Sequence, residues 1–206
     1  MGNSVKIIVQ KIVFVLILTG TVLPGMGQKG RFTGGALIGF NGIQIAGDIE
    51  ERVGAGGLSA GLCLELSVAK KSAVQMELKY TRKGSIHPYT NPYGLHDWEV
   101  LGLHYVEIPV VARHGLGKKP NFFFVEGGLS WGYLFNTYYS ETRMERYSDP
   151  PLVERFRKNE FSWIVGAGYH LNKGPLRNFS FLFRYNRSIL PVHETLPYYN
   201  VVYGVY

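Results

Sequence analysis

The sequence predicts an all-β fold: an eight-stranded antiparallel up-and-down transmembrane β-barrel, preceded by a cleavable signal peptide. Three observations support this. Apolar and polar residues alternate along several segments, as they do in strands, where successive side chains point to opposite faces. One face of these segments is bulky and apolar, while the other carries Gly, Ser or single charges. The connections between the segments alternate between short and long.

The composition agrees with a β fold. The 206 residues include 26 Gly, and 14% are aromatic, a combination that with little helical periodicity is typical of strands and turns. The net charge is +7, but the basic residues are scattered among Tyr and Glu, which favours a solvated surface over nucleic-acid binding. Cys63 is the single cysteine, so an intramolecular disulfide is excluded.

The first residues have the organisation of a secretory signal. Lys6 and Lys11 precede the apolar run 12–18, which is followed by Pro24 and the small-residue stretch 25–27. A membrane-spanning helix needs roughly 20 apolar residues, and this run is shorter. We therefore expect a signal peptide at residues 1–27 and one barrel domain at residues 28–206. An uncleaved anchor is the alternative.

Eight strands are expected along the chain. Their ranges are 32–41, 56–66, 73–82, 100–113, 121–135, 160–171, 178–188 and 198–206. The clearest alternation is AVQMELKY at residues 73–80. There Val74, Met76, Leu78 and Tyr80 lie opposite Gln75, Glu77 and Lys79.

The chemistry of the two faces indicates which one is the inside. A soluble core packs large apolar side chains inward and turns long polar ones outward. Here rows of Gly and Ser lie opposite the bulky apolar rows, which suits a narrow lumen with room for a few long charged residues. We therefore expect Val74, Met76, Leu78 and Tyr80 to face lipid, and Glu77 and Lys79 to face the lumen.

The connections support the same topology. The short ones are 67–72, 114–120 and 172–177, and the long ones are 42–55, 83–99, 136–159 and 189–197. Short periplasmic turns that alternate with long extracellular loops are characteristic of outer-membrane barrels. A Greek-key sandwich gives no reason for this alternation.

Two segments carry a resemblance to a known family. Residues 77–84 read ELKYTRKG, residues 103–109 read LHYVEIP, and the first hairpin is rich in Gly. The chain resembles the PorT-like small outer-membrane β-barrels of Bacteroidota, some of which serve in secretion or gliding machinery. The resemblance implies an eight-stranded outer-membrane barrel. It also implies a last strand of about ten residues that closes on a terminal aromatic residue, whereas the last strand here is short. We expect either that Tyr206 is the terminal aromatic residue or that the natural chain continues beyond it.

The inner face is expected to hold a group of charged residues. They are Glu65, Glu77, Lys79, Glu107, Glu126 and Arg184, with Arg113 near a strand end. The lumen of an eight-stranded barrel is filled by side chains, so these groups must pair or retain water. We expect a structural ion-pair network; a gated pore or ligand-sensing plug is the alternative. Pro109 cannot donate a ladder hydrogen bond, so a bulge or distorted pairing is expected beside Glu107.

The long segment 136–159 is the candidate interaction surface. It mixes acids with Tyr and Arg, the types enriched in binding surfaces. The residues chosen are Tyr139, Arg143, Arg146, Tyr147 and Arg157. A protein partner, a glycan or lipopolysaccharide would suit them, and a plain solvated loop is the alternative.

Aromatic residues near the strand ends are expected to form a girdle at the headgroup level. They are Tyr80, Tyr105, Tyr133, Phe135, Tyr138, Tyr139, Trp163, Tyr169 and Tyr185.

The sequence gives little support for a catalytic site or a metal site. His170 and Ser162 share a strand face but lie too far apart to touch, and Ser130 would need a histidine on a neighbouring strand. His87, His96 and Asp97 share a long loop as the weak metal candidate. We expect no catalytic residue, no cofactor and no metal.

The sequence therefore predicts a non-catalytic integral outer-membrane protein with a structural or interaction role through its long loops. An accessory role in a secretion system is one such function. The expected partners are outer-membrane lipid and lipopolysaccharide, the barrel-assembly machinery during insertion and a secretion or envelope protein, but no nucleic acid. The alternatives are an outer-membrane lipid-modifying enzyme and a secreted soluble barrel that binds a small apolar ligand.

Overall fold

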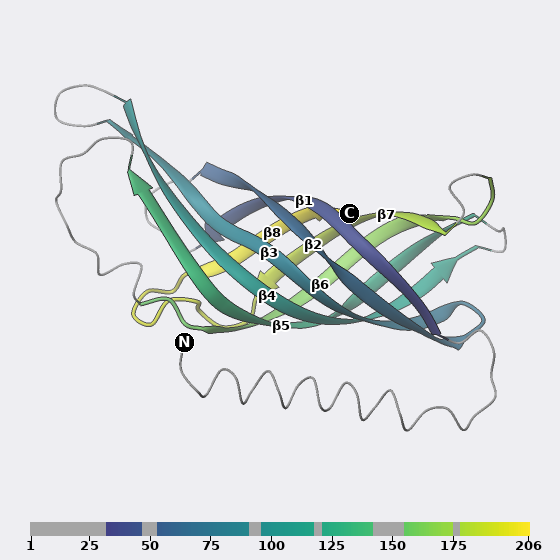
Figure 1. Cartoon of the computed structure of the whole chain (residues 1–206). Helices are drawn as coiled ribbons and strands as arrows, with labels where there is room; N and C mark the ends of the chain where they lie inside the picture. Colours follow the sequence, from purple (N-terminus) through teal and green to yellow (C-terminus); the bar gives the residue numbers. More distant parts are fainter. Residues whose placement is uncertain (1–31, 47–52, 91–95, 118–120, 142–154, 175–177) are drawn as a thin grey trace. The chain divides into compact units, whose positions relative to one another are not determined.

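The computed structural model describes residues 32–46, 53–90, 96–117, 121–141, 155–174 and 178–206. The expected signal peptide at residues 1–27 lies outside these ranges. The strands are β1 (Phe32–Ala46), β2 (Val53–Ala69), β3 (Ser72–Thr90), β4 (His96–Leu116), β5 (Phe122–Glu141), β6 (Asn159–Leu171), β7 (Phe179–Ser188) and β8 (Tyr199–Val205). They form a closed barrel in sequence order, β1 to β8, and every neighbouring pair is antiparallel (Figure 1). The described residues include no helix that is long and apolar enough to cross a membrane.

The predicted fold class is confirmed, and every expected strand occurs. The main difference lies at the long-loop end, where β3, β4 and β5 continue into segments that the sequence assigned to loops. β3 and β4 stay paired from Lys83↔Leu103 to Thr90↔His96. The reason is that a ladder of backbone hydrogen bonds continues whether or not the side chains keep an apolar alternation. Figure 1 shows the ends of β3 and β4 reaching past β1 and β2.

The outer wall is apolar, as predicted. On β3, Glu77 and Lys79 are buried, at 2% and 3% exposed, whereas Leu78 between them is 51% exposed. On β2, Leu62 is 66% exposed. Along this part of β2 and β3 the inner face is polar and the outer face apolar, which is the reverse of the apolar interior and polar exterior of a secreted soluble barrel.

Glycines on the inner face let the strands approach closely. A Cβ atom on Gly128 of β5 would lie 2.1 Å from the carbonyl oxygen of Val110 on β4. A Cβ on Gly61 of β2 would lie 2.4 Å from the carbonyl oxygen of Leu78 on β3. Both distances are far below van der Waals contact, so the curvature of this narrow barrel depends on residues that have no side chain.

Bulges interrupt the ladders at two places on the long-loop half. The register of β2 with β3 shifts between Gly54 and Ser59. The register of β4 with β5 shifts between His104 and Tyr105. The sequence predicts a bulge or distorted pairing beside Glu107, and the structure shows the second. The β4–β5 register is continuous through Pro109↔Ser130. On the other side of β4, the β3–β4 partners pass from Met76↔Val110 to Lys79↔Glu107 without a change of register, so the pairing is interrupted there and no bulge forms.

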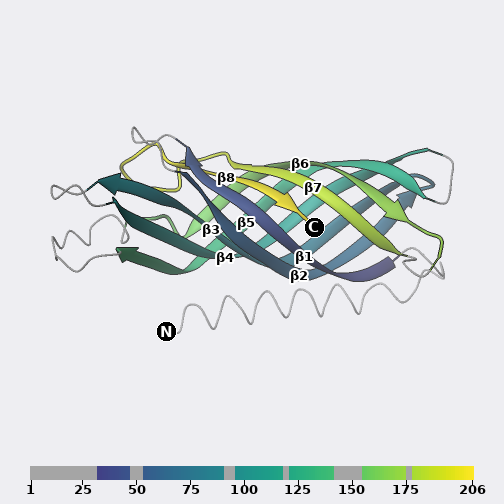
Figure 2. The same cartoon turned by 90° about the horizontal axis from the view of Figure 1, so that it is seen from above.

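The short strand β8 closes the barrel. It pairs with β1 from Phe40↔Val205 to Ala46↔Tyr199, and with β7 from Phe183↔Val205 to Arg187↔Val201. Figures 1 and 2 place the C-terminus partway along the wall. From this position, Tyr206 extends toward the lumen side chains of other strands.

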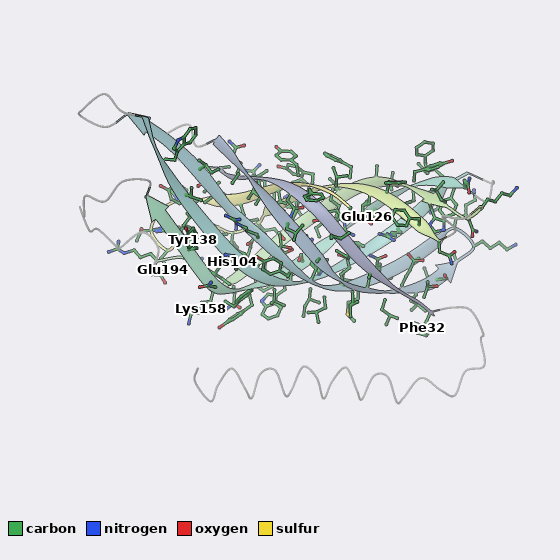
Figure 3. The ribbon with its side chains drawn as sticks, turned by 45° about the horizontal axis from the view of Figure 1, so that its top comes forward. Phe32, His104, Glu126, Tyr138, Lys158 and Glu194 are labelled. Atoms are coloured by element: carbon green, nitrogen blue, oxygen red, sulfur yellow. The ribbon has the colours of Figure 1, made fainter. Side chains whose placement is uncertain are left out.

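The long-loop end of the lumen holds an apolar cluster. Its buried residues are Ile45, Leu101, Leu103, Tyr105, Leu134, Phe156, Val192 and Tyr198. Segments 155–158 and 189–198 contribute the last three and are joined by hydrogen bonds such as Arg157 N to Val192 O at 2.7 Å. Figure 3 shows Lys158 and Glu194 of these segments at the same end of the barrel as Tyr138, opposite Phe32.

Candidate functional site: the charged lumen

The middle of the barrel encloses nine charged side chains, which we call the lumen network. They are Glu65, Glu77, Lys79, Lys83, Glu107, Arg113, Glu126, Glu160 and Arg184. Six strands supply them, from β2 to β7. Apart from Glu65 and Arg113, every one of them is at most 5% exposed.

The half of the network nearer the short turns is a chain of alternating charges. Arg184 of β7 donates from Nη1 to Oε2 of Glu77 at 2.7 Å and from Nη2 to Oε1 at 2.6 Å. Its Nε donates to Glu126 of β5. Arg113 of β4 donates from Nε to the other oxygen of Glu126 at 2.8 Å and from Nη1 to Glu65 at 3.2 Å. Figure 3 shows Glu126 nearer than His104 to the end at which Phe32 lies.

The other half is organised around Lys83 of β3. Its Nζ lies 2.7 Å from Oε1 of Glu107 and 2.7 Å from Oε1 of Glu160. Lys79 Nζ lies 3.3 Å from the second oxygen of Glu107. Asn200 Nδ2 donates to the second oxygen of Glu160 at 2.8 Å. Each carboxylate therefore has a partner at both oxygens.

The Tyr206 ring lies between the two halves. Lys79 Nζ donates to its hydroxyl at 3.2 Å and lies 5.1 Å from the ring centroid. The guanidinium carbon of Arg184 lies 5.4 Å from the same centroid. A cation within about 6 Å of an aromatic face is attracted by the ring quadrupole, so Tyr206 joins one cation from each half.

The network holds five acids and four bases, so the acids are in excess by one. The acids are Glu65, Glu77, Glu107, Glu126 and Glu160, and the bases are Lys79, Lys83, Arg113 and Arg184. Removing water from a charge is costly unless a partner with good geometry replaces it. Every member of the network has at least one partner of opposite charge within ion-pair distance.

The structure places all six charged residues chosen from the sequence on the inner side of the wall and in contact with one another or with Arg113. Sequence reasoning missed Lys83, because it ended the third strand at residue 82 and counted Lys83 as a loop residue. It also missed Glu160, although this residue is the first of the expected strand 160–171 and shares the face of Ser162. The signal was present, since Lys83 continues the inward alternation of Gln75, Glu77, Lys79 and Thr81.

The prediction that Tyr105 belongs to an outer aromatic girdle is wrong. Tyr105 is fully buried in the lumen, with Lys83 Nζ 4.8 Å from its ring centroid. Asn200 Nδ2 donates to its hydroxyl at 3.4 Å. Tyr105 shares the inward parity of Glu107 on β4, while its neighbour His104 faces outward, where its ring lies 6.2 Å from that of Phe135.

The proposed interaction surface is described only in part. Arg157 is exposed, and the backbone of Tyr139 belongs to β5. Arg143, Arg146 and Tyr147 lie outside the described residues. The side chains of His87, His96 and Asp97 also lie outside them. Among the side chains that are described, no three His, Cys, Asp or Glu residues are placed to hold a metal ion.

Residues 128–132 read Gly-Leu-Ser-Trp-Gly, which matches the Gly-x-Ser-x-Gly pattern of serine hydrolases. In those enzymes the serine occupies a sharp turn between a strand and a helix. Here the five residues lie inside β5, and the cross-strand neighbours of Ser130 are Pro109 and Ser162. Ser130 therefore has no histidine beside it. His170 instead meets Ser180 on β7, with Nδ1 and Oγ 2.8 Å apart.

Comparison with known protein families agrees with this architecture. The family model of the outer membrane protein beta-barrel domain matches residues 27–194, more than half of the chain. No curated protein matches the chain.

Proposed function

Because the chain belongs to the outer membrane protein beta-barrel domain family, we propose that it is a non-catalytic integral outer-membrane protein that anchors a binding surface on the extracellular side. The observation that carries this proposal is the filled lumen. Lys83, Glu107 and Arg184 are at most 2% exposed in the middle of the barrel. An eight-stranded barrel is just wide enough to be filled by its own side chains. We therefore propose that the lumen does not conduct ions or small molecules.

The projecting part of the sheet supplies a surface suited to a partner. β5 pairs with β4 as far as Glu99↔Glu141, but its pairing with β6 ends at Tyr133↔Asn159. Within the described residues, the β5 edge beyond Leu134 therefore has no strand partner. An open edge offers backbone groups to an added strand, and the exposed Tyr138 and Arg157 lie at the same end.

The family resemblance of residues 77–84 and 103–109 supports a finer proposal. We place the chain with the PorT-like barrels, as an accessory that holds a protein of a secretion or envelope system at the cell surface. Lipopolysaccharide is the second expected contact of the long-loop end, and the barrel-assembly machinery is the expected partner during insertion. These roles rest on sequence likeness and on the projecting edge, not on a bound partner.

Site-specific photo-crosslinking in cells tests the binding role. A photoreactive residue at Tyr138 or Arg157 is expected to give a discrete cross-linked product. The control is Lys173 in the turn between β6 and β7, which is exposed and is expected to give none of that product. Equal products from all three positions would argue against a surface restricted to the long-loop end.

Conductance in a planar bilayer tests the closed lumen. The purified protein is expected to give no steady ion current. A regular open-channel current from the wild-type protein would contradict the proposal and would favour the alternative of a gated pore.

A lipid-modifying enzyme is the second candidate, and the contact between His170 and Ser180 is the observation that favours it. A serine beside a histidine is the minimal arrangement for an activated nucleophile. If this pair is catalytic, deletion of the gene changes the mass of the membrane lipids, and Ser180→Ala reproduces that change. We expect unchanged lipid masses in both strains.

A further inference from the structure

A groove of about 480 Å³ lies on the outer wall across β1 to β4. Its lining includes Phe40, Gly56, Leu58, Tyr80, Arg82 and His104. The side chains of Arg82 and His104 face the surroundings of the barrel, because these residues alternate with the buried lumen residues Thr81, Lys83 and Tyr105. The lining also includes the buried Asn41, whose amide donates to Ser59 Oγ at 2.6 Å.

The groove exists because of the glycines of β2. A Cβ atom on Gly56 would have nothing within 4 Å, so the space beside it is open. A Cβ on Gly57 would lie 2.5 Å from the carbonyl oxygen of Arg82, which means that only glycine lets β2 come so close to β3 there. These residues form the bulge between Gly54 and Ser59. The β4–β5 bulge lies on the other side, at His104.

A cation and two polar rings gather at one end of the groove. Arg82 of β3 lies directly opposite His104 of β4 in the strand register. The Tyr80 hydroxyl is 2.7 Å from Nδ1 of His104. In the tautomer in which Nδ1 accepts the hydrogen bond of the Tyr80 hydroxyl, the imidazole carries its own proton on Nε2, where it can donate to an anion. In that tautomer the end of the groove combines a permanent positive charge with a hydrogen-bond donor.

The other end of the groove is apolar. Phe40 is 74% exposed and Leu58 is 40% exposed. In the strand register both lie level with Arg82, since Phe40 pairs with Leu58 and the next pair toward the short turns is Ser59 with Thr81. The outward residues Leu78 and Met76 follow Tyr80 toward the short turns and continue the apolar surface. A transmembrane strand needs roughly 9 to 11 residues, so Arg82, eight positions after Val74, stands at the edge of the apolar band.

We propose that this groove binds a phosphate-bearing lipid of the outer leaflet, with its phosphate at Arg82 and His104, in the open space that Gly56 leaves beside them, and an acyl chain over Leu58 and Phe40. Arginine forms strong, charge-assisted hydrogen bonds with phosphate oxygens. The proposal uses the membrane location of the barrel, but it does not depend on a partner at the projecting edge of β5.

Lipid binding by the purified protein in detergent, measured by native mass spectrometry, tests this. The probes are bisphosphorylated lipid A, the same lipid without phosphate, and inorganic phosphate. The wild-type protein is expected to bind the phosphorylated lipid at least about tenfold more tightly than the dephosphorylated one. Inorganic phosphate at an equal concentration is expected not to displace it. Equal binding of the two lipids, or displacement by free phosphate, would overturn the proposal.

Variants locate the binding. Arg82→Gln is expected to remove the preference for the phosphorylated lipid, and Gly56→Leu is expected to fill the groove and weaken binding about tenfold. The matched control is Gly34→Leu on β1, where a Cβ also has nothing within 4 Å. It should bind like the wild type. An equal loss in both leucine variants, or an unchanged preference in Arg82→Gln, would place the lipid elsewhere. The mobility of unheated samples on a gel verifies that each variant is folded, and Arg82→Gln decides the question if Gly56→Leu does not fold.

Discussion

The guanidinium of Arg184 on β7 donates hydrogen bonds to both carboxylate oxygens of Glu77 on β3 in the middle of the barrel. The distances are 2.7 Å from Nη1 to Oε2 and 2.6 Å from Nη2 to Oε1. In a ring of eight strands, β3 and β7 are four positions apart and therefore lie on opposite walls. Paired strands are already joined by backbone hydrogen bonds, but opposite walls have no such link. The ion pair therefore acts as a cross-brace, and Glu126 holds the same guanidinium from a third strand.

The first prediction concerns this brace. Arg184→Met leaves Glu77 buried without an ion-pair partner and leaves Glu126 with Arg113 alone, and removal of one partner of a buried pair costs about 3 to 5 kcal/mol. The free energy of unfolding, measured by urea titration of the refolded protein, is expected to fall by that amount. Arg157→Met, at an exposed position, should change it by less than about 0.5 kcal/mol.

The brace also predicts a non-additive double variant. Glu77→Leu combined with Arg184→Met should be more stable than Arg184→Met alone, because the combination removes the carboxylate that Arg184→Met leaves without an ion-pair partner. If the double variant is instead the sum of two large losses, the two side chains do not act as a pair.

A second prediction compares the two lysines of the network. Lys83 lies 2.7 Å from each of two glutamates, whereas Lys79 lies 3.3 Å from one. Lys83→Met should therefore lower the free energy of unfolding by about 3 to 5 kcal/mol, and Lys79→Met by less. The same urea titration measures both. A larger loss for Lys79→Met would mean that its contact with Tyr206 matters more than the double ion pair.

A third prediction tests the inside and outside of the wall. Leu62, exposed on the outer face of β2, is expected to lie at mid-membrane, so Leu62→Arg should cost roughly 2 to 4 kcal/mol. Val68 has the same outward orientation near the turn, and Val68→Arg should cost only about 0 to 1 kcal/mol. Insertion into lipid vesicles, followed by urea unfolding, measures both. A harmless Leu62→Arg would invert the assignment of the two faces.

A fourth prediction uses two adjacent glycines of β5. A Cβ on Gly128 would lie 2.1 Å from the Val110 carbonyl oxygen, while a Cβ on Gly127 would make an ordinary contact of 3.8 Å. Gly128→Ala must push β5 away from β4, and such overpacking typically costs about 1 to 3 kcal/mol. Gly127→Ala is expected to be neutral within about 0.5 kcal/mol. If both variants change the urea midpoint equally, the close approach of β5 to β4 at Gly128 does not require glycine.

The strands and their faces could be predicted because both are local properties. In AVQMELKY the alternation alone separates Leu78 from Glu77, and the small residues opposite the aromatic rows indicate which face is enclosed. The lengths of the strands could be predicted less well from the sequence. Lys83 belongs to β3 because β4 continues to pair with it, and a strand's end depends on its neighbour as much as on its own residues.

The sequence by itself therefore determined the number of strands, their order and the side of the wall on which Glu77, Lys79 and Arg184 lie. Only the tertiary structure decided their partners: Arg184 meets Glu77 of β3, Lys83 joins Glu107 to Glu160, and Tyr105 turns into the lumen. The physical reason is that partners inside a barrel lie on strands that need not be neighbours. Which side chains meet is set by the closure and the stagger of the whole ring, and no single segment contains that information.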